Sequence, residues 1–289
     1  MFAQFIVNGL ITGLLYSLLA IGFALVYNTT RIFHIAAAGI YVFAAYAFWW
    51  LAVKCGIPLL LAAILAIALT MGLSLFSEVG VYRPLRGKKS SLSVTMIASI
   101  GLMTVIVNLI AMVFGNETKV VETAILKTYS LGNLIITTPQ LYQIIVSVVA
   151  ITAFLILLGR TRLGLRVRAL SADESLFESL GYDKQRAFSL VFLASGLFIG
   201  LASCALVYDV GLDPNMGMTV LINAMVAMII GGAGRFGTCV AGGLLLGVLQ
   251  SLTVYCFASN WQNAITFALL LGFLFLRPQG IAGYKQRVV

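Results

Sequence analysis

Charged side chains are scarce in this sequence. Of its 289 residues, 9% are Asp, Glu, Lys or Arg, whereas 61% are hydrophobic. A soluble domain carries about 25% charged residues, so this chain has too few polar groups to cover its own surface in water. We therefore expect a protein whose outer surface faces lipid.

Acidic residues and histidine are scarcer still within the apolar segments, and the cysteines do not cluster. Eight of the nine acids lie in predicted loops, and only Glu78 approaches an apolar segment, near its end. Carriers driven by protons or sodium need ionisable groups or unwound carbonyls inside the membrane. This scarcity argues against a secondary transporter or channel acting alone. With one histidine and no paired carboxylates, a membrane-embedded enzyme is also disfavoured, and we expect no catalytic, metal-binding or cofactor-binding residue. The four cysteines lack metal-ligand spacing: Cys55, Cys204, Cys239 and Cys256.

Long apolar segments dominate what is present. A membrane-spanning helix needs about 20 apolar residues, and nine segments approach this length. The sequence therefore predicts an all-α, polytopic membrane bundle of eight or nine spans, forming a single transmembrane domain over residues 1–289. The second and seventh segments are short or interrupted by small residues, so each either spans the membrane or re-enters it. The segments are 4–27, 35–53, 57–80, 92–114, 140–158, 186–208, 216–232, 238–256 and 261–276.

The basic residues indicate an orientation. The net charge of +9 does not predict nucleic-acid binding, because the basic residues sit in short loops between apolar segments. Cytoplasmic loops of membrane proteins are enriched in Lys and Arg. If residues 159–186 are cytoplasmic, only Lys54, Lys119 and Lys127 fall on the outer side, so the N-terminus is outside and the C-terminus is cytoplasmic. The inner side then holds Arg31, Arg83, Arg86, Lys88, Lys89, Arg160, Arg162, Arg166, Arg168, Lys184, Arg186, Arg235, Arg277, Lys285 and Arg287.

Small and uncharged polar residues also recur inside the apolar segments. Glycines one helical turn apart allow two helices to approach closely in lipid, although glycine is also simply common in membrane helices. Polar amides and hydroxyls suit a pathway for a small polar or zwitterionic solute, or else they bond neighbouring helices. The candidate packing glycines are Gly9, Gly13, Gly196, Gly200, Gly243 and Gly247, and the candidate pathway residues are Asn8, Thr12, Tyr16, Thr104, Asn108 and Asn223.

The segment 159–186 is the one long charged stretch. Ser171 followed by Glu174 has the spacing of a capping box, and Gly181 is a natural left-handed stop, so we expect a helix over 172–180. Leu176, Phe177 and Leu180 form an apolar ridge on it, together with Ala172. Asp173 and Glu174 occupy its first turn, and Arg166 and Arg168 precede it.

A helix this short is marginal in water and must pack on something. It either packs on its own bundle, lies on the membrane, or docks into a groove of a cytoplasmic partner. Three acids disfavour an anionic membrane surface. We therefore expect residues 159–186 to form a cytoplasmic segment that docks on a partner or packs on its own bundle.

A glycine-rich stretch at 231–237 is similar to a loop that cradles phosphate. It lacks the Lys and Ser/Thr that such a loop requires, so we expect a tight cytoplasmic turn instead. Its residues are Gly231, Gly232, Gly234 and Arg235.

Taken together, several blocks resemble the permease subunits of ATP-binding-cassette (ABC) importers for branched-chain amino acids, whose relatives carry urea and short amides. The resemblance covers nearly the whole chain. Its most specific blocks are TRLGLRVRALSADESLFESLGYDKQR (161–186) and GGAGRFGTCVAGGLLLG (231–247), supported by NGLITGLLYSLLAIGFALVY (8–27), RIFHIAAAGIYVFAAY (31–46), YRPLRGKKSSLSVTMIASIGL (82–102) and LRPQGIAG (276–283). One departure is His34-Ile-Ala-Ala-Ala-Gly39, where many members have an internal His and an acid.

The resemblance implies an inner-membrane permease that holds no ATP site of its own. It implies a second permease subunit, related or identical, two cytoplasmic ATPases and an extracytoplasmic solute-binding protein. It also implies that 159–186 is a cytoplasmic coupling segment, with the ATPases docking on residues 161–186. The solute pathway would lie between the two permeases. The implied solute is a branched-chain or other apolar amino acid, with urea or a short amide as the alternative.

Overall fold

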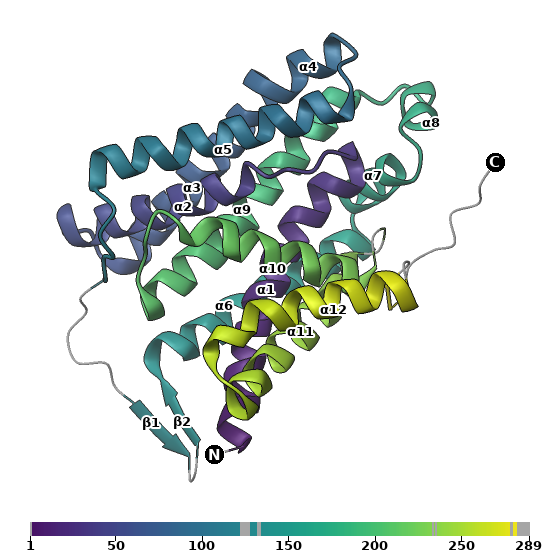
Figure 1. The fold of residues 1–289 in the computed structure, drawn as a ribbon. Helices are drawn as coiled ribbons and strands as arrows, with labels where there is room; N and C mark the ends of the chain where they lie inside the picture. Colours follow the sequence, from purple (N-terminus) through teal and green to yellow (C-terminus); the bar gives the residue numbers. More distant parts are fainter. Residues whose placement is uncertain are drawn as a thin grey trace.

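The computed structural model describes residues 2–121, 128–131, 134–232, 234, 236–277 and 280–281. Within these residues the chain is a bundle of helices with one small hairpin (Figure 1), which confirms the expected all-α membrane bundle. Glu122, Lys127, Arg235, Lys285 and Arg287 lie outside the described residues.

Long helices account for the predicted spans. The helices are α1 (Phe2–Thr30), α2 (Ala37–Trp49), α3 (Leu59–Ser77), α4 (Arg83–Gly87), α5 (Leu92–Phe114), α6 (Thr138–Arg160), α7 (Arg162–Ala172), α8 (Glu174–Ser179), α9 (Lys184–Val210), α10 (Met216–Gly231), α11 (Phe236–Cys256) and α12 (Gln262–Leu276). A π-helical turn, Trp50–Lys54, extends α2, and another, Glu78–Tyr82, joins α3 to α4. Strands β1 (Thr128–Leu131) and β2 (Leu134–Thr137) pair antiparallel between the predicted segments 92–114 and 140–158.

Eight helical stretches among the described residues are long and apolar enough to cross a membrane. The second predicted segment is one of them, because its π-helical turn extends it to Lys54. The seventh is not, since α10 has 16 residues. At 1.5 Å per residue, α10 is about 24 Å long, less than the roughly 30 Å of the hydrocarbon core.

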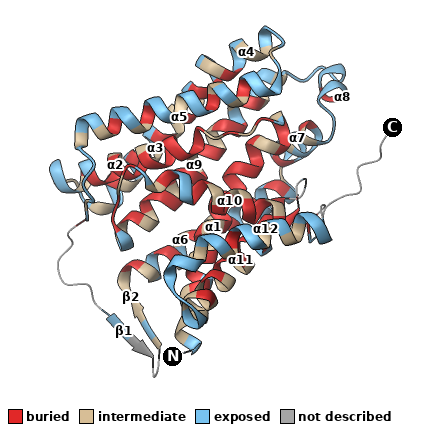
Figure 2. Cartoon of the chain, in the orientation of Figure 1, coloured by how far each residue is buried: buried red, intermediate tan, exposed pale blue. Residues whose placement is uncertain are grey.

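Helix α1 lies at the centre of the bundle, and α12 lies at its edge. In the most apolar 18-residue window, 78% of the residues are buried in α1 but only 6% in the stretch that contains α12. Figure 2 shows the same contrast, with α1, α2 and α9 mostly buried and α5 and α12 mostly exposed on their outer faces. The exposed faces of α3, α5, α6 and α12 are dominated by large apolar side chains, as a lipid-facing surface requires.

Glycines allow α1 and α11 to pack closely. A Cβ atom added to Gly9 would lie 2.8 Å from Val248 Cα, and one added to Gly13 would lie 2.8 Å from Leu244 Cα. From the other side, Gly243 faces Ser17 and Gly247 faces Gly13 at distances that leave no room for a methyl group. This confirms close helix packing through both pairs.

The third glycine pair brings α9 onto α3. A Cβ atom on Gly196 would lie 2.8 Å from Ser74 Cβ, whereas one on Gly200 would meet Ile67 at an ordinary 3.4 Å. The close approach therefore depends on Gly196 more than on Gly200.

Candidate functional site

Helix α8 projects from the end of the bundle that also carries α4 and α7, opposite the hairpin and the N-terminus (Figure 1). The expected capping box at Ser171 is wrong. Ser171 belongs to α7, and its hydroxyl donates to the carbonyl of Arg168 at 2.9 Å. An N-cap residue must leave helical geometry. Asp173 does so, with φ −153° and ψ 111°, and α8 begins one residue later.

Asp173 supplies the cap that Ser171 does not. Its carboxylate accepts hydrogen bonds from the backbone N–H groups of Ser175 at 2.8 Å and Leu176 at 3.0 Å, and from the Ser175 hydroxyl at 2.6 Å. The Ser175 hydroxyl, and then the Leu176 N–H, lower the pKa of this carboxyl. The cap is therefore ionised, and accepts fully, at neutral pH.

The other end of α8 follows the sequence prediction. Gly181 has a φ of +82°, and its N–H bonds to the carbonyl of Glu178 at 2.9 Å. Glu174, instead of closing a capping box, lies 3.4 Å from the ammonium of Lys184, which also binds Glu178 at 2.8 Å. These exposed pairs bring the start of α9 alongside α8.

The predicted apolar ridge of α8 divides into two faces. Phe177 is only 3% exposed and packs with Leu170 and Phe188, and its ring stacks on Tyr182. Leu176 and Leu180 are 58% and 65% exposed. The expectation that all three face a partner is therefore wrong for Phe177, which anchors α8 to its own bundle and leaves two leucines facing outward.

A charged pair lies beneath this anchor. The guanidinium of Arg86 lies 4.2 Å from the ring centre of Phe188 and forms an ion pair with Glu78, which is 1% exposed. Arg83, which is closer to Glu78 in the sequence, donates to the side chain of Gln185 instead. Contacts thus run from α8 through Phe188 and Arg86 to the end of α3.

Arg166 and Arg168, which precede α8, are exposed on α7. The Arg166 guanidinium lies 5.4 Å from the ring centre of Tyr182. This cation–π contact places Arg166 beside the Phe177–Tyr182 stack, whereas Arg168 extends into solvent from the same helix.

The predicted pathway residues fall into two groups. In the first, the Asn223 amide donates to the Tyr16 hydroxyl at 3.1 Å, and the Gln250 amide donates to Asn223 at 3.1 Å and to Thr266 at 2.6 Å. These bonds join α1, α10, α11 and α12. Asn223, Gln250 and Thr266 are at most 4% exposed, so this group is a hydrogen-bonded link between helices and offers no open path.

The second group faces outward. Thr104 and Asn108 are exposed on α5, where the Asn108 amide donates to the Thr104 carbonyl at 2.8 Å. On α1, Asn8 and Thr12 are half-buried, and Asn8 accepts from Gln4. The structure therefore does not bring the six residues together: α5 carries an outward polar stripe, and the rest lie on α1 and α10.

The glycine-rich turn between α10 and α11 is tight. Gly232 and Gly234 have φ angles of +101° and +109°, which glycine adopts readily. A Cβ atom on Gly231 would collide with the carbonyl of Thr238. The described part of this loop thus agrees with the expected turn, while Arg235 lies outside the described residues.

A buried histidine network was not predicted. His34 is fully buried, and its Nδ1 lies 2.8 Å from the Tyr82 hydroxyl, which donates to Ser99 at 2.8 Å. Ser99 also accepts from the backbone N–H of Ala36 at 2.9 Å. The network joins the start of α2 to α5 and to the end of the α3 span. Its sequence signature was a lone histidine near the end of a span, which does not reveal its partners.

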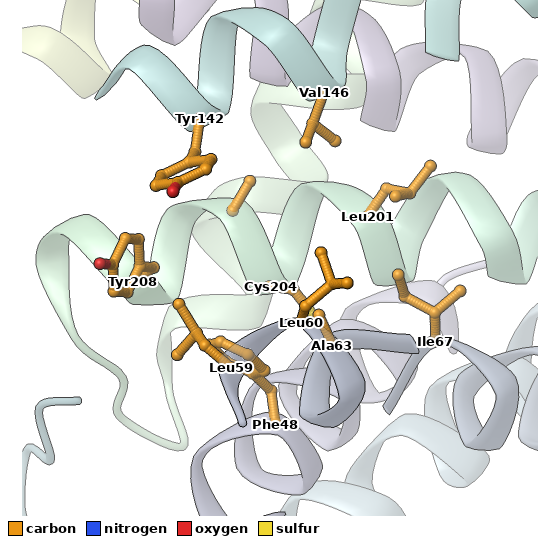
Figure 3. A pocket seen from close by; sticks show the side chains of 11 residues that line it. Phe48, Leu59, Leu60, Ala63, Ile67, Tyr142, Val146, Leu201, Cys204 and Tyr208 are labelled. Carbon is orange, nitrogen blue, oxygen red and sulfur yellow. The ribbon is translucent and has the colours of Figure 1, made fainter. Parts of the chain in front are cut away.

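A cavity of about 330 Å³ lies between α3, α6 and α9 (Figure 3). Tyr142 and Tyr208 carry hydroxyls at one end, and Cys204 is the other lining residue with a polar side-chain atom. Two hydroxyls and a thiol cannot neutralise the charges of a zwitterion, so this cavity does not suit a free amino acid. Within the described residues, no group of three or more His, Cys, Asp or Glu is placed to hold a metal ion.

The comparisons with known proteins agree over nearly the full chain. Residues 5–274 match the family model described as the permease component of the branched-chain amino acid transport system. The chain is 27% identical to the high-affinity branched-chain amino acid transport system permease protein BraD of Pseudomonas aeruginosa, over 99% of this chain and 97% of that protein.

More distant relatives give the same description. The chain is 26% identical to LivH of Escherichia coli, a high-affinity branched-chain amino acid transport system permease protein, over 99% of this chain and 96% of that one. It is 24% identical to a probable LivH permease of Methanocaldococcus jannaschii, over 92% of this chain and 88% of that one.

A solved structure shares the fold. A chain of PsaBC from Streptococcus pneumoniae, solved with a Fab, has a TM-score of 0.56 at 15% identity, covering 96% of this chain and 97% of that one.

Proposed function

Because this chain belongs to the family of branched-chain amino acid transport system permease components, we propose that it is the permease subunit of an ABC importer for branched-chain amino acids. It is a multi-pass protein of the inner membrane, with eight helical stretches fit to span it. The solute assignment rests on BraD and LivH, whose names describe this transport and whose lengths the chain matches almost fully.

The proposal rests on which side chains of α8 are buried and which are exposed. One side chain, Phe177, is buried in the chain's own packing, while Leu176 and Leu180 project from the end of the bundle. Exposed leucines on a short, capped helix outside the membrane suit insertion into a groove of another protein. We assign α8 as the element that docks an ATPase subunit, with Asp173 and Gly181 fixing its ends and Arg166 and Arg168 at its edge. Two copies of the permease fold would engage two ATPases.

The outward polar stripe of α5 supports a pathway shared with a second permease subunit. A spanning helix that faces lipid gains nothing from an exposed amide, whose oxygen would lack a partner in hydrocarbon. Thr104 and Asn108 are exposed on such a helix. Facing a second permease, related or identical, they would line a passage in which uncharged groups bind a zwitterion weakly enough to release it.

The outer end of the bundle is the proposed docking side for a solute-binding protein. It carries the hairpin β1–β2, which the Gln4 side chain ties to α1 through two hydrogen bonds with the backbone of Ile135, at 2.8 and 2.9 Å. This side is extracytoplasmic if the uneven division of Lys and Arg fixes the orientation.

The test is removal of the exposed leucines of α8. Each leucine contributes about 1.5–3 kcal/mol if a partner buries it fully. The double variant Leu176→Ser with Leu180→Ser should therefore lose its co-purified ATPase and its ATP-driven uptake of labelled leucine in reconstituted vesicles. Its thermal unfolding should match that of the unaltered chain, because neither side chain contributes to the bundle's packing.

The matched control is Phe177→Ala on the same helix. Removing a buried phenylalanine costs about 3–5 kcal/mol, so this variant should be less stable and lose the ATPase only as α8 detaches. If the double serine variant keeps its ATPase at full stoichiometry and takes up leucine normally, α8 is not the docking element.

A further inference from the structure

The junction of α6 and α7 presents a second exposed surface, separate from α8. Helix α6 ends at Arg160, and α7 begins two residues later at Arg162. Thr161 caps α7, accepting from the N–H of Gly164 at 3.1 Å. A Cβ atom on Gly164 would collide with the backbone of Leu157 and Leu158. The first turn of α7 therefore folds back against the last turn of α6.

This contact with the end of α6 sets where the first turn of α7 lies relative to the membrane. Leu157 and Leu158 belong to a stretch long and apolar enough to span the membrane. Residues 162–165, which lie against them, are therefore at the membrane boundary and not free in solution. Two of them, Leu163 and Leu165, are 55% and 60% exposed. They continue the exposed apolar surface of α6, where Ile156 and Leu157 are 53% and 51% exposed.

The same turn is strongly basic. Arg160, Arg162, Arg166 and Arg168 fall within nine residues, and the stretch 159–172 contains no acid. Arg160 and Arg162 are exposed and form no ion pair with any acid in the described part of the chain. The acids of α8 already have a counter-charge, since Lys184 forms ion pairs with Glu174 and Glu178. The arginines next to the membrane boundary thus lack a counter-charge.

From this juxtaposition we propose that the α6–α7 junction is a binding site for an anionic phospholipid. Arg160 and Arg162 bind the headgroup phosphates, and Leu163 and Leu165 rest on the upper acyl chains beside Ile156 and Leu157. An arginine fork binds two phosphate oxygens at once, and a basic turn that also exposes leucines has the composition of an interfacial helix. An acidic groove of a cytoplasmic protein would match the charge but would leave the two leucines against lipid without a role.

The site is distinct from the proposed ATPase contact. Leu176 lies on the next helix, beyond the Asp173 cap, Leu180 is the C-cap of that helix, and Arg166 is turned to Tyr182. The lipid site therefore predicts an effect on lipid selectivity with no change in ATPase binding.

The test uses the full-length permease, purified with any bound ATPase and exchanged with equal amounts of phosphatidylglycerol and phosphatidylcholine of the same acyl chains. Native mass spectrometry then counts each bound lipid. The unaltered chain should prefer phosphatidylglycerol. Each arginine at an anionic surface is worth about fivefold in affinity, so the double variant R160Q/R162Q should lower that preference about 25-fold. The charge-retaining variant R160K/R162K should keep most of it.

Three controls make the outcome decisive. The variant K88Q/K89Q removes two other exposed cations at the same end of the bundle and should leave the preference unchanged. ATPase co-purification should be intact in R160Q/R162Q. If R160Q/R162Q does not fold, Arg162→Gln alone should still lower the preference about fivefold.

Three results would overturn the proposal. These are an unchanged preference in R160Q/R162Q, an equal loss in K88Q/K89Q, or loss of the ATPase from R160Q/R162Q, which would assign the turn to protein docking.

Discussion

Burial separates polar residues that the sequence presents as equivalent. Asn223 and Asn108 are both amides within apolar helices. Asn223 is 4% exposed and bonds to Tyr16 and Gln250, whereas Asn108 is exposed and its oxygen has no partner in the described part of the chain. One amide therefore holds helices together, and the other is available to a neighbour or a solute.

Substitution by leucine should distinguish these two roles. Asn223→Leu removes two interhelical hydrogen bonds, worth about 0.6 kcal/mol each in membranes. It takes Asn223 away from the Tyr16 hydroxyl and leaves Gln250 with Thr266 alone. It should lower the unfolding temperature of the purified chain, and uptake should fall only with the folded fraction. Asn108→Leu should leave the unfolding temperature unchanged but alter the KM or rate of leucine uptake. Equal destabilisation by both would contradict the assignment.

Contacts between distant residues also explain why the sequence analysis placed the cap of α8 at the wrong residue. Ser171 and Asp173 are both good N-cap residues, and the sequence offers Glu174 to complete a box with Ser171. The choice depends on where α7 ends, and α7 is held in place by the packing of Gly164 on α6 and of Leu170 on Phe177 and Phe188. Such packing is tertiary, so a local pattern does not reveal it.

Helix pairs show what sequence patterns predict well. The glycines of α1 and α11 were identified from their spacing alone, because small residues one turn apart let two helices approach closely in lipid. What the pattern could not give was the partner: Gly9 and Gly13 meet Gly247 and Leu244, more than 220 residues away. Similarly, α10 was ambiguous because only its length, bounded by Asn215 and Gly232, separates it from a full span.

Gly247→Ala should destabilise the bundle strongly. Its new methyl group would collide with Gly13 and with the carbonyl of Gly9, and overpacking of a tight interface costs about 1–3 kcal/mol or more. Because backbone atoms cannot move aside, we expect lower thermal stability and reduced yield of folded protein in detergent.

Gly72→Ala, on α3, is the matched control. Nothing lies within 4 Å of its added Cβ, and alanine in a helix is favoured over glycine by about 0.5–1 kcal/mol. Its unfolding temperature should equal or exceed that of the unaltered chain. A stable Gly247→Ala variant would mean that α1 and α11 are not held at this distance.

The whole molecule has two chemically different ends. The end with α4, α7 and α8 carries most of the described arginines, and the opposite end carries Lys54, Lys119 and the hairpin. This difference between the two ends was predictable from the sequence. Successive spans place their connecting loops at alternate ends, so the basic residues of every second loop gather at one end. The anchoring of α8 by Phe177 was not predictable, because it requires knowing that Phe188 of α9 lies beneath it.

Cysteine labelling tests the proposed orientation. In a chain whose four native cysteines are replaced, cysteines at Lys88 and Arg168 should be shielded from an impermeant thiol reagent in right-side-out vesicles. A cysteine at Glu117, which is exposed between α5 and the hairpin, should react. Detergent should render all three reactive. Labelling of Arg168→Cys in sealed vesicles would reverse the orientation.

The energy source of transport follows from the scarcity of charge. Glu78, directly after α3, is buried but neutralised by Arg86, and no acid was expected at mid-membrane. Uptake of leucine should therefore persist when an uncoupler collapses the proton gradient while ATP is held constant. Depleting ATP with the gradient intact should stop it. Loss of uptake under the uncoupler at constant ATP would indicate an ion-coupled carrier.

The α1–α11 contact has a consequence for how the chain is made. Ser17 of α1 donates to the carbonyl of Val240, 223 residues later, at 3.0 Å. At a synthesis rate of about 5–20 residues per second, α1 therefore waits about 11–45 s for its partner to emerge. During that interval the glycine face of α1 lacks α11, and the Ser17 hydroxyl has the carbonyl of Gly13 in its own helix as its partner. A chain stalled before residue 240 therefore lacks the helix that packs on Gly9 and Gly13, and this side of the central helix α1 stays uncovered.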